Sequence, residues 1–341
     1  MKKFSFALLI VFLFVLLIGS SAYAEKIRVA VADFVNREPK MDSAQSFYFL
    51  KHIAEEFTKI LDSYSDKIDA VSSKSLQTLN ALTPKSLASV AKSEGCKYIV
   101  LGALTKFDVN SYVSYKSNSL IPTMDAQTSV YTVTFDVRVI EADTGKVVFS
   151  SSGTGQRSYR QTIENAKKIA ASKEAQQEAI KESESIFNST YSSASSMAAE
   201  KVYTFLTGEY PEIISLKANT AKKKKSKTKS KKEKAKVESL GTVNINYGSK
   251  SGITEESFYR VFYEGEEIFD FTGNSLGCEK FNLAIARVSS VKDDYCTAEV
   301  IGGIFSNIRN GDKAERITSD EAQLIIDEND FVKNRLSEFL R

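Results

Sequence analysis

Tryptophan is absent from this 341-residue sequence, and histidine occurs only once, as His52. A single histidine excludes HExxH helices, Cys2His2 fingers and other metal sites that need two or more histidines. On the amphipathic helix predicted for residues 43–61, His52 lies about 140° from Phe47 and away from the apolar stripe. We therefore interpret His52 as a surface residue and predict no catalytic residue, cofactor or metal.

An enzyme is the opposing hypothesis. With one histidine, its nucleophile and its base would have to come from carboxylate or lysine chemistry. The acidic pairs Glu55-Glu56, Glu266-Glu267 and Asp293-Asp294 are adjacent in sequence. Neighbouring residues point in different directions on a helix or strand, so none of these pairs forms a shared-proton dyad by itself. We expect a protein that is not an enzyme.

Cysteine is also scarce, with Cys96, Cys278 and Cys296 and no CxxC pair. Three cysteines cannot form a complete disulfide framework. Cys278 and Cys296 lie on strands of one predicted domain, so they could form a disulfide in an oxidising compartment or remain buried thiols. The sequence leaves both alternatives open because it does not determine the distance between them. We expect Cys96 in the core.

Glycine-rich phosphate loops are not supported either. Gly153-Thr154-Gly155 resembles the start of a dinucleotide-binding loop, but Ser158 stands where the third glycine belongs. The segment also follows a hairpin strand instead of opening a βαβ unit. We expect no nucleotide site.

The N-terminus has the pattern of a secretory signal peptide. Lys2 and Lys3 precede an apolar run over residues 4–18, and Ala22 and Ala24 form a small-x-small peptidase site. We predict a signal peptide over residues 1–24, with cleavage after Ala24. The alternative is an uncleaved anchor, but this run is shorter than the roughly 20 residues that span a bilayer. No cysteine lies near the site, so we expect an exported, periplasmic protein that is not a lipoprotein.

Charge is concentrated in one short segment. Residues 222–236 contain ten lysines and one glutamate, which is +9, whereas the whole chain carries +3, so the rest of the chain carries −6. No apolar periodicity accompanies the lysines, and we predict an extended, solvated linker over residues 211–239. Contact of the linker with an anionic envelope polymer or lipid surface is the open alternative. Nucleic acid is not expected, because no aromatic residues are interleaved for base stacking.

Before the linker, the pattern predicts a three-layer α/β domain with a mixed sheet over residues 25–210. Strands are expected at 27–35, 68–71 and 98–107, alternating with helices. A hairpin follows at 130–141 and 146–152, in which Tyr131, Val133 and Phe135 share a dry face while Thr132 and Thr134 share a wet one. Residues 163–206 are expected to form one or two helices, interrupted near 188–196.

After the linker, short strands with glycine turns predict a small β-barrel over residues 240–318. Among the turns we expect Glu264-Gly265. A terminal helix over residues 319–341 is predicted, with Ser319 as its N-cap.

Three segments resemble the curli assembly/transport CsgG family: VAVADFVN at 29–36, GCKYIVLGALTKFD at 95–108 and FDVRVIEADTGKVVFSSSGTG at 135–155. They occur in the order of that family, and the resemblance covers about residues 25–207. It implies a periplasmic or outer-membrane-associated protein. Well-known members form rings whose inserted hairpins make a secretion channel, and relatives are envelope adaptors that activate cell-wall synthases. The block VNINYGSKSGITEESFYRVFYEGEEI is similar to the SH3-like C-terminal domain of flagellar assembly protein T.

Two features depart from the channel-forming members. Those members are lipoproteins, and this sequence has no lipobox cysteine. Their inserted hairpins correspond to about 109–131 and 154–191 here. The first segment has only a faint apolar alternation, and the second is predicted to be a charged helix over 164–185. We therefore expect an oligomeric scaffold or adaptor more than a self-inserted pore.

The function predicted from the sequence is a non-catalytic role in assembly or transport of an extracellular or envelope structure, as curli-like secretion or as a ring scaffold. The alternative is a periplasmic adaptor or a glycan- or peptidoglycan-binding protein that regulates envelope enzymes. We expect a homo-oligomer with protein partners in the cell envelope or outer membrane. The residues predicted to contact a partner or a membrane are Tyr112, Tyr115 and Tyr131.

Overall fold

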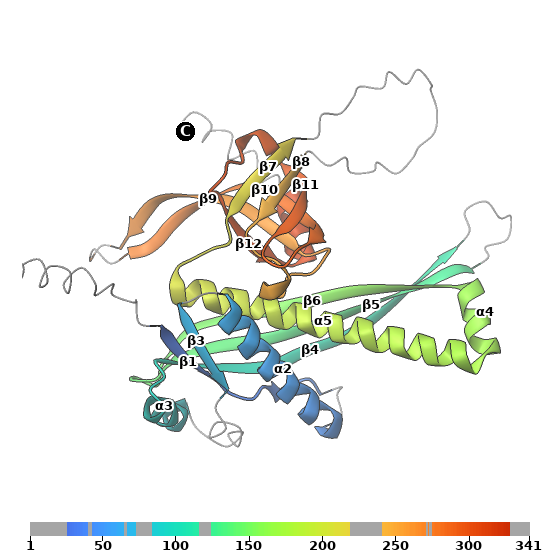
Figure 1. Ribbon diagram of the computed structural model, residues 1–341, viewed down its shortest axis with the longest axis horizontal. Helices are drawn as coiled ribbons and strands as arrows, with labels where there is room; N and C mark the ends of the chain where they lie inside the picture. Colours follow the sequence, from blue (N-terminus) through green and yellow to red (C-terminus); the bar gives the residue numbers. More distant parts are fainter. Residues whose placement is uncertain are drawn as a thin grey trace, which may run out of the picture.

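The computed structural model describes residues 26–39, 43–64, 67–72, 84–115, 124–218, 241–270, 272 and 275–327. The predicted signal peptide with Ala22 and Ala24, the lysines of 222–236 and the end of the predicted terminal helix lie outside these residues. The described residues form two units, each built on its own sheet (Figure 1).

The first unit contains a mixed sheet, as predicted. Its central strands follow the order β3-β1-β4-β5-β6, with β2 beside β4. β1 pairs in parallel with β3 and β4, whereas β4, β5 and β6 pair antiparallel. The strands are β1 (Ile27–Val31), β2 (Val35–Asn36), β3 (Ile68–Ser72), β4 (Tyr98–Tyr115), β5 (Met124–Glu141) and β6 (Val147–Thr162). The helices are α2 (Ser43–Ser63), α3 (Pro84–Ser93), α4 (Ile163–Ala171) and α5 (Lys173–Thr207).

Helices cover both faces of this sheet because β1 is apolar on both sides. Val29 and Val31 belong to one buried cluster with Phe57 of α2, whereas Ala30 joins a second cluster with Leu87 of α3. α2 and α5 therefore lie on one face and α3 on the other. Among the described helices of the first unit, α3 is the one on the outer face, and it covers only one end of the sheet (Figure 1).

The long helices differ from the prediction. The interruption expected near 188–196 is wrong, because α5 is continuous from Lys173 to Thr207 and the break lies at Ser172. Ser172 caps α5 by accepting a hydrogen bond from the backbone N–H of Ala175 at 3.3 Å. The small residues of 193–199 lie inside α5 and belong to its buried part.

Gly153 and Gly155 explain why that part of α5 has small side chains. A Cβ atom added at Gly155 would lie 1.9 Å from the carbonyl oxygen of Thr190, and one at Gly153 would lie 2.2 Å from that of Ala194. The backbones of β6 and α5 therefore approach more closely than a side chain on β6 would allow. The glycine pair is a packing feature.

The second unit is an antiparallel sheet with the order β12-β9-β10-β11-β8-β7. β7 lies inside the predicted 211–239 linker and pairs with β8, so this boundary was wrong. The turn predicted at Glu264-Gly265 is also wrong, because β9 continues through it. The elements are β7 (Ile213–Ala218), β8 (Gly241–Ile245), η2 (Ser249–Ser251), β9 (Phe258–Phe269), β10 (Ser275–Val291), β11 (Cys296–Gly303), η3 (Phe305–Asn307), β12 (Lys313–Ile317) and α6 (Ser319–Asp327).

Backbone hydrogen bonds connect the first and last strands of this sheet at one end. The N–H of Ile213 donates to the carbonyl of Asp312 at 2.8 Å, and the N–H of Ala314 donates to that of Pro211 at 2.7 Å. The SH3-like barrel stays a prediction. At α6, Thr318 forms a capping box with Glu321 and takes the role predicted for Ser319.

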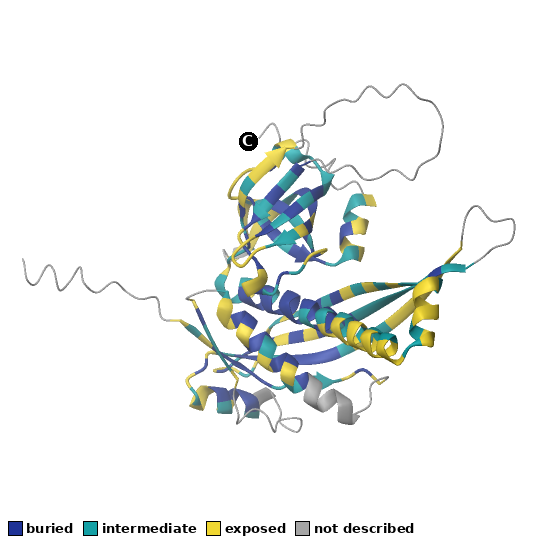
Figure 2. Ribbon diagram, turned by 45° about the vertical axis from the view of Figure 1, so that its right-hand side comes forward, coloured by how far each residue is buried: buried dark blue, intermediate teal, exposed yellow. Residues whose placement is uncertain are grey.

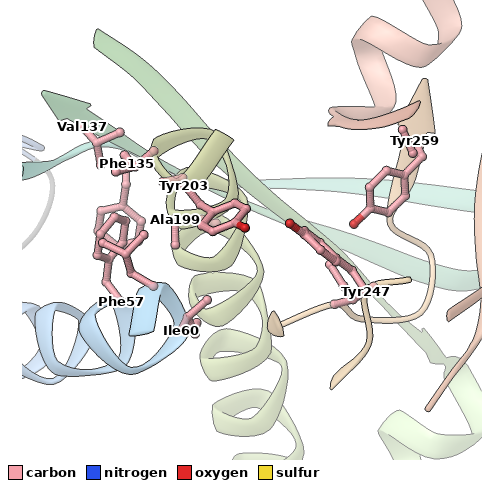
Figure 3. Packing of buried hydrophobic residues seen from close by; sticks show 14 of the residues in the cluster. Phe57, Ile60, Phe135, Val137, Ala199, Tyr203, Tyr247 and Tyr259 are labelled. Atoms are coloured by element: carbon pink, nitrogen blue, oxygen red, sulfur yellow. The ribbon is translucent and has the colours of Figure 1, made fainter. Parts of the chain in front are cut away.

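The two units share one buried cluster. It contains Phe57 and Tyr203 from the first unit and Tyr247 and Tyr259 from the second (Figure 3). In that view, Tyr203 of α5 and Tyr247 face each other across the boundary, with ring centroids 6.5 Å apart. The contact between the units is therefore part of the core.

Candidate functional site

A groove of about 690 Å³ lies between the outer face of β4–β6 and the second unit. We call it the polar groove. Its floor comes from the three strands, and its wall comes from the segment before β9, from β10 and from β12 with the start of α6. The floor residues are Lys106, Asn110, Tyr112, Val130, Thr132, Thr134, Thr154, Gln156 and Ser158. The wall residues include Glu256, Ser257, Phe258, Arg287, Arg316, Ile317, Thr318, Ser319 and Asp320.

The floor is polar because β5 alternates. Val133 and Phe135 are fully buried in the cluster on the α5 side, so Thr132 and Thr134 point to the other face, where the groove lies. This is the wet face predicted from the sequence. The Thr134 hydroxyl lies 3.1 Å from that of Thr154. Ser319 donates a hydrogen bond to Oε1 of Gln156 at 2.7 Å, which connects the wall to the floor.

Cationic side chains outnumber carboxylates around the groove. The four cations are Lys106, Arg157, Arg287 and Arg316, and the two carboxylates are Glu256 and Asp320, which leaves an excess of two positive charges. Such an excess inside a concave surface attracts anions.

Arg157 of β6 reaches from the first unit to the second. One Nη atom donates to Oγ1 of Thr254 at 2.6 Å, and the other donates to the carbonyl of Gln156 at 3.0 Å. Burial, followed by the positive charge of Arg316, lowers the pKa of Arg157, and Glu256 acts in the opposite direction. Two guanidinium groups are therefore close enough to repel each other.

Arg316 of β12 is buried, with 3% of the residue exposed. Its guanidinium donates to the hydroxyls of Ser196 and Ser193 on α5 and to that of Ser257 in its own unit. The Ser193 and Ser257 contacts measure 3.0 and 3.1 Å. The helix and the second sheet are thus joined by one charged side chain with three hydroxyl partners.

Glu200 lies beside Arg316 at the boundary between the units and is 3% exposed. The hydroxyl of Tyr259 donates to its Oε2 at 3.3 Å. Burial raises the pKa of Glu200 to about 7, although the charge of Arg316 opposes the shift. Tyr64 of the first unit donates to the carbonyl of Ser251 at 3.0 Å and adds a further bond across the boundary.

The three predicted contact tyrosines do not form one cluster. Tyr112 lines the groove, and both Tyr112 and Tyr115 are 60% exposed. Tyr131 is two positions from Val133 on β5, so it shares the face that packs toward α5, and it is half-buried. A contact of any of them with a partner or a membrane stays a prediction.

His52 is exposed on α2, in agreement with its predicted surface position. The three cysteines are free thiols, Cys96 and Cys296 buried and Cys278 exposed. The disulfide considered between Cys278 and Cys296 is therefore not formed. Cys296 pairs with Val291 on β10, whereas Cys278 lies at the other end of that strand, opposite Glu267.

Sequence reasoning missed the charged residues of the boundary. Arg157, Arg287 and Arg316 are single arginines on alternating strands, a pattern typical of any solvated face. Glu200 offers a weak signal, because it is the one acidic residue among the small and apolar residues of 190–203. In the part of the chain that the structure describes, no group of three His, Cys, Asp or Glu residues could hold a metal ion.

Comparison with known proteins supports the resemblance noted for the first unit. The model of the family described as curli production assembly/transport component CsgG matches residues 72–237. No curated protein matches the chain. In the described part of the chain, no helix combines the length and the apolar character needed to cross a bilayer.

Several solved structures show low similarity. Lipoprotein GNA1162 from Neisseria meningitidis is 15% identical, with 40% of this chain and 84% of that chain covered and a TM-score of 0.25. Hypothetical protein CT253 from Chlamydia trachomatis is 12% identical, with 54% of this chain and 99% of that chain covered and a TM-score of 0.35. A PelC dodecamer from Paraburkholderia phytofirmans is 20% identical, with 39% of this chain and 71% of that chain covered and a TM-score of 0.22. TM-scores this low do not establish a common fold.

Proposed function

We propose that this protein is a non-catalytic, exported component of the bacterial envelope. In this proposal it acts as an oligomeric scaffold in the assembly or transport of an extracellular or envelope structure. The CsgG family match over 72–237 supports the proposal, because this range contains β4, β5, β6 and α5. The predicted signal peptide supports a periplasmic or outer-membrane-associated location. The non-catalytic part rests on the single histidine, which is exposed on α2.

The main structural observation in favour of a scaffold is a projecting arm. We define the arm as residues 105–115, 124–134 and 154–189, in which three long strands and the start of α5 extend beyond the rest of the first unit (Figure 1). Figure 2 shows many exposed residues on the helical side of the arm, whereas α5 is buried farther along. The arm therefore carries exposed surface away from the rest of the first unit.

The arm presents an edge suited to self-association. Along β4, Val109 is 43% exposed, Val113 is 45% exposed, and Tyr112 and Tyr115 are 60% exposed. Among the described residues, no strand pairs with the outer edge of β4 from Val109 to Tyr115. Exposed edge strands with apolar side chains are templates for pairing with another chain.

The first prediction concerns this edge. In light scattering of residues 25–341, with and without mild detergent, we expect a mass of several protomers. The double variant Tyr112→Ser with Tyr115→Ser should shift the protein toward monomer, because it removes two exposed rings from the edge. Tyr295→Ser is the matched control, since Tyr295 is 37% exposed in the second unit.

A monomer that is indifferent to detergent would contradict the scaffold. A ring-sized assembly in detergent would justify measuring conductance, which tests the curli-like secretion form of this function. The second candidate function is a periplasmic adaptor or a glycan- or peptidoglycan-binding protein. It is favoured by the polar groove at the boundary of the units. A pull-down with isolated sacculi distinguishes this candidate from a scaffold that binds only other copies of the same protein.

A further inference from the structure

The deep end of the polar groove connects two guanidinium groups through hydroxyls. Arg157 donates to Thr254, whose Oγ1 lies 3.1 Å from Oγ of Ser257, and Arg316 donates to Ser257 and Ser193. The hydroxyls accept from cations, so their own protons remain to be donated. Thr254 and Ser257 can use only one of their two protons between themselves, which leaves one proton for an external acceptor. Among the described residues, Ser193 likewise has no acceptor for its hydroxyl proton.

This arrangement suits an anion. A carboxylate or phosphate oxygen accepts from hydroxyls and from guanidinium N–H groups, and bonds of this kind are among the stronger ones in proteins. Arg157 uses two of its five N–H donors in the bonds to Thr254 and Gln156, so donors are left for a ligand. Glu200 stands behind Arg316, and the pKa raised by burial means that it neutralises Arg316 incompletely near pH 7.

Two more cations of the groove lining, Lys106 and Arg287, are exposed to solvent. Within the described part of the chain, neither Lys106 on the floor nor Arg287 on the wall has a carboxylate within ion-pair distance. Glu256 and Asp320 are the carboxylates of the lining, and four cations outnumber them. Four cations from different strands therefore share one groove, which favours a chain with repeated negative groups over a single small ion.

The remaining lining selects the kind of chain. The floor offers hydroxyl and amide groups of Thr132, Thr154 and Gln156, which match the hydroxyls of a sugar chain. Tyr112 and Phe258 supply the aromatic rings, and both are at least partly exposed. Recognition of peptides uses apolar pockets or free strand edges. The groove instead presents the polar face of a sheet, in which the central strand β5 is paired on both sides, with β4 and with β6.

We propose that the polar groove binds an acidic polysaccharide. Carboxylate or phosphate groups of the polysaccharide bind Arg157 and Arg316 at the deep end, and its repeating charges follow Arg287 and Lys106. This inference does not depend on self-association through the arm. It gives the second candidate function a ligand class and a location.

The test is a calorimetric titration of residues 25–341, both unaltered and with the ten lysines of 222–236 changed to serine. The serine variant removes a competing site for polyanions. The probes are polygalacturonate for carboxylate, dextran phosphate for phosphate, unmodified dextran, and polyglutamate of matched length. We expect the serine variant to bind at least one of the two acidic glycans, with affinity that falls as salt is raised. Dextran should not bind, and polyglutamate should bind about tenfold more weakly.

Arg287→Glu in the serine variant should weaken the binding of the acidic glycan by about tenfold or more, because it reverses a charge on the groove wall. Arg138→Glu is the matched control, since Arg138 is exposed on the same sheet face but does not line the groove. Far-ultraviolet circular dichroism checks that both variants fold. The relative response to the two acidic glycans identifies carboxylate or phosphate as the recognised group.

Three results would overturn the proposal. The first is that the serine variant binds neither acidic glycan, and the second is that Arg138→Glu and Arg287→Glu lose the same affinity. The third is that polyglutamate binds as tightly as the acidic glycan. The last result would mean that the groove recognises an acidic peptide. None of them bears on the oligomeric mass, so the scaffold proposal stands or fails separately.

Discussion

At the scale of single residues, Glu200 and Arg316 show what a buried charge does at the boundary between the units. Arg316 is compensated by three hydroxyls and by the nearby carboxyl of Glu200, which itself accepts from Tyr259. Burying a charge is costly unless such partners are present. Because the partners come from both units, the two residues make docking of the units specific.

Glu200 also makes the stability of the protein depend on pH. Burial raises its pKa in the folded protein to about 7, above the ordinary value of 4.5. Between these values the unfolded chain loses the proton while the folded chain keeps it. The contribution of Glu200 to the free energy of unfolding is therefore full below about pH 4.5, declines as the pH rises to about 7, and is constant above.

The second prediction concerns Glu200→Gln, which removes this titration. Relative to the variant, the wild type should lose up to ~3 kcal/mol in free energy of unfolding between pH 5 and pH 8. Urea unfolding of both proteins at the two pH values measures this difference. Glu178→Gln, an exposed change on the same helix, is the control. A difference between wild type and Glu200→Gln that is the same at both pH values would refute the assignment.

At the scale of elements, local sequence pattern predicts most of the strands and helices well. The alternation in β5 correctly separates the dry face of Val133 and Phe135 from the wet face of Thr132 and Thr134. For α5, the same kind of reasoning from local pattern gave a wrong prediction, namely an interruption near 188–196. The serine and alanine segment of α5 lacks a wide apolar stripe, because the surface it packs on is the glycine-containing part of β6. Backbone approach between two elements cannot be recognised from either one alone.

The third prediction follows from that approach. Gly155→Ala should lower the free energy of unfolding by about 1–3 kcal/mol or more, since the added methyl would overlap the carbonyl oxygen of Thr190. Ser158→Ala on the same strand is the control, because Ser158 is exposed and its change should stay within about 0.5 kcal/mol. Denaturant unfolding of both variants gives the comparison. Equal stability of Gly155→Ala and wild type would mean that α5 can move away from β6 at little cost.

At the scale of the whole molecule, the two units behave as one folded body. β7 precedes the lysine-rich segment and β8 follows it, yet the two strands pair in the same sheet. The buried cluster contains residues from both units, and Arg316 bonds to serines of α5. In sequence, the lysine-rich segment therefore connects two paired strands of one sheet and does not connect independent domains.

The fourth prediction tests this arrangement. A specific protease site inserted after Lys229 should allow complete cleavage, while the two fragments still elute together in gel filtration. They should separate only in denaturant, because pairing of β7 with β8 and the shared core hold them together. The same site inserted after Leu324, an exposed residue of α6, is the control for accessibility. Separation of the fragments without denaturant would show that the units are merely tethered.

The sequence by itself determined the features that depend on local backbone geometry. These are the mixed α/β character of the first unit, the strand-rich character of the second, and the exposure of His52. They follow from the two- and 3.6-residue periods, which any chain obeys wherever it lies in the fold.

The tertiary structure decided the rest. Ser196 and Arg316 are 120 residues apart in sequence and bond across the boundary of the units. The polar groove likewise joins β4–β6 to residues more than a hundred positions away. The membership of β7 in the second sheet and the free state of Cys278 and Cys296 were decided in the same way. These features depend on which buried surfaces match one another, a long-range competition that local periodicity does not encode.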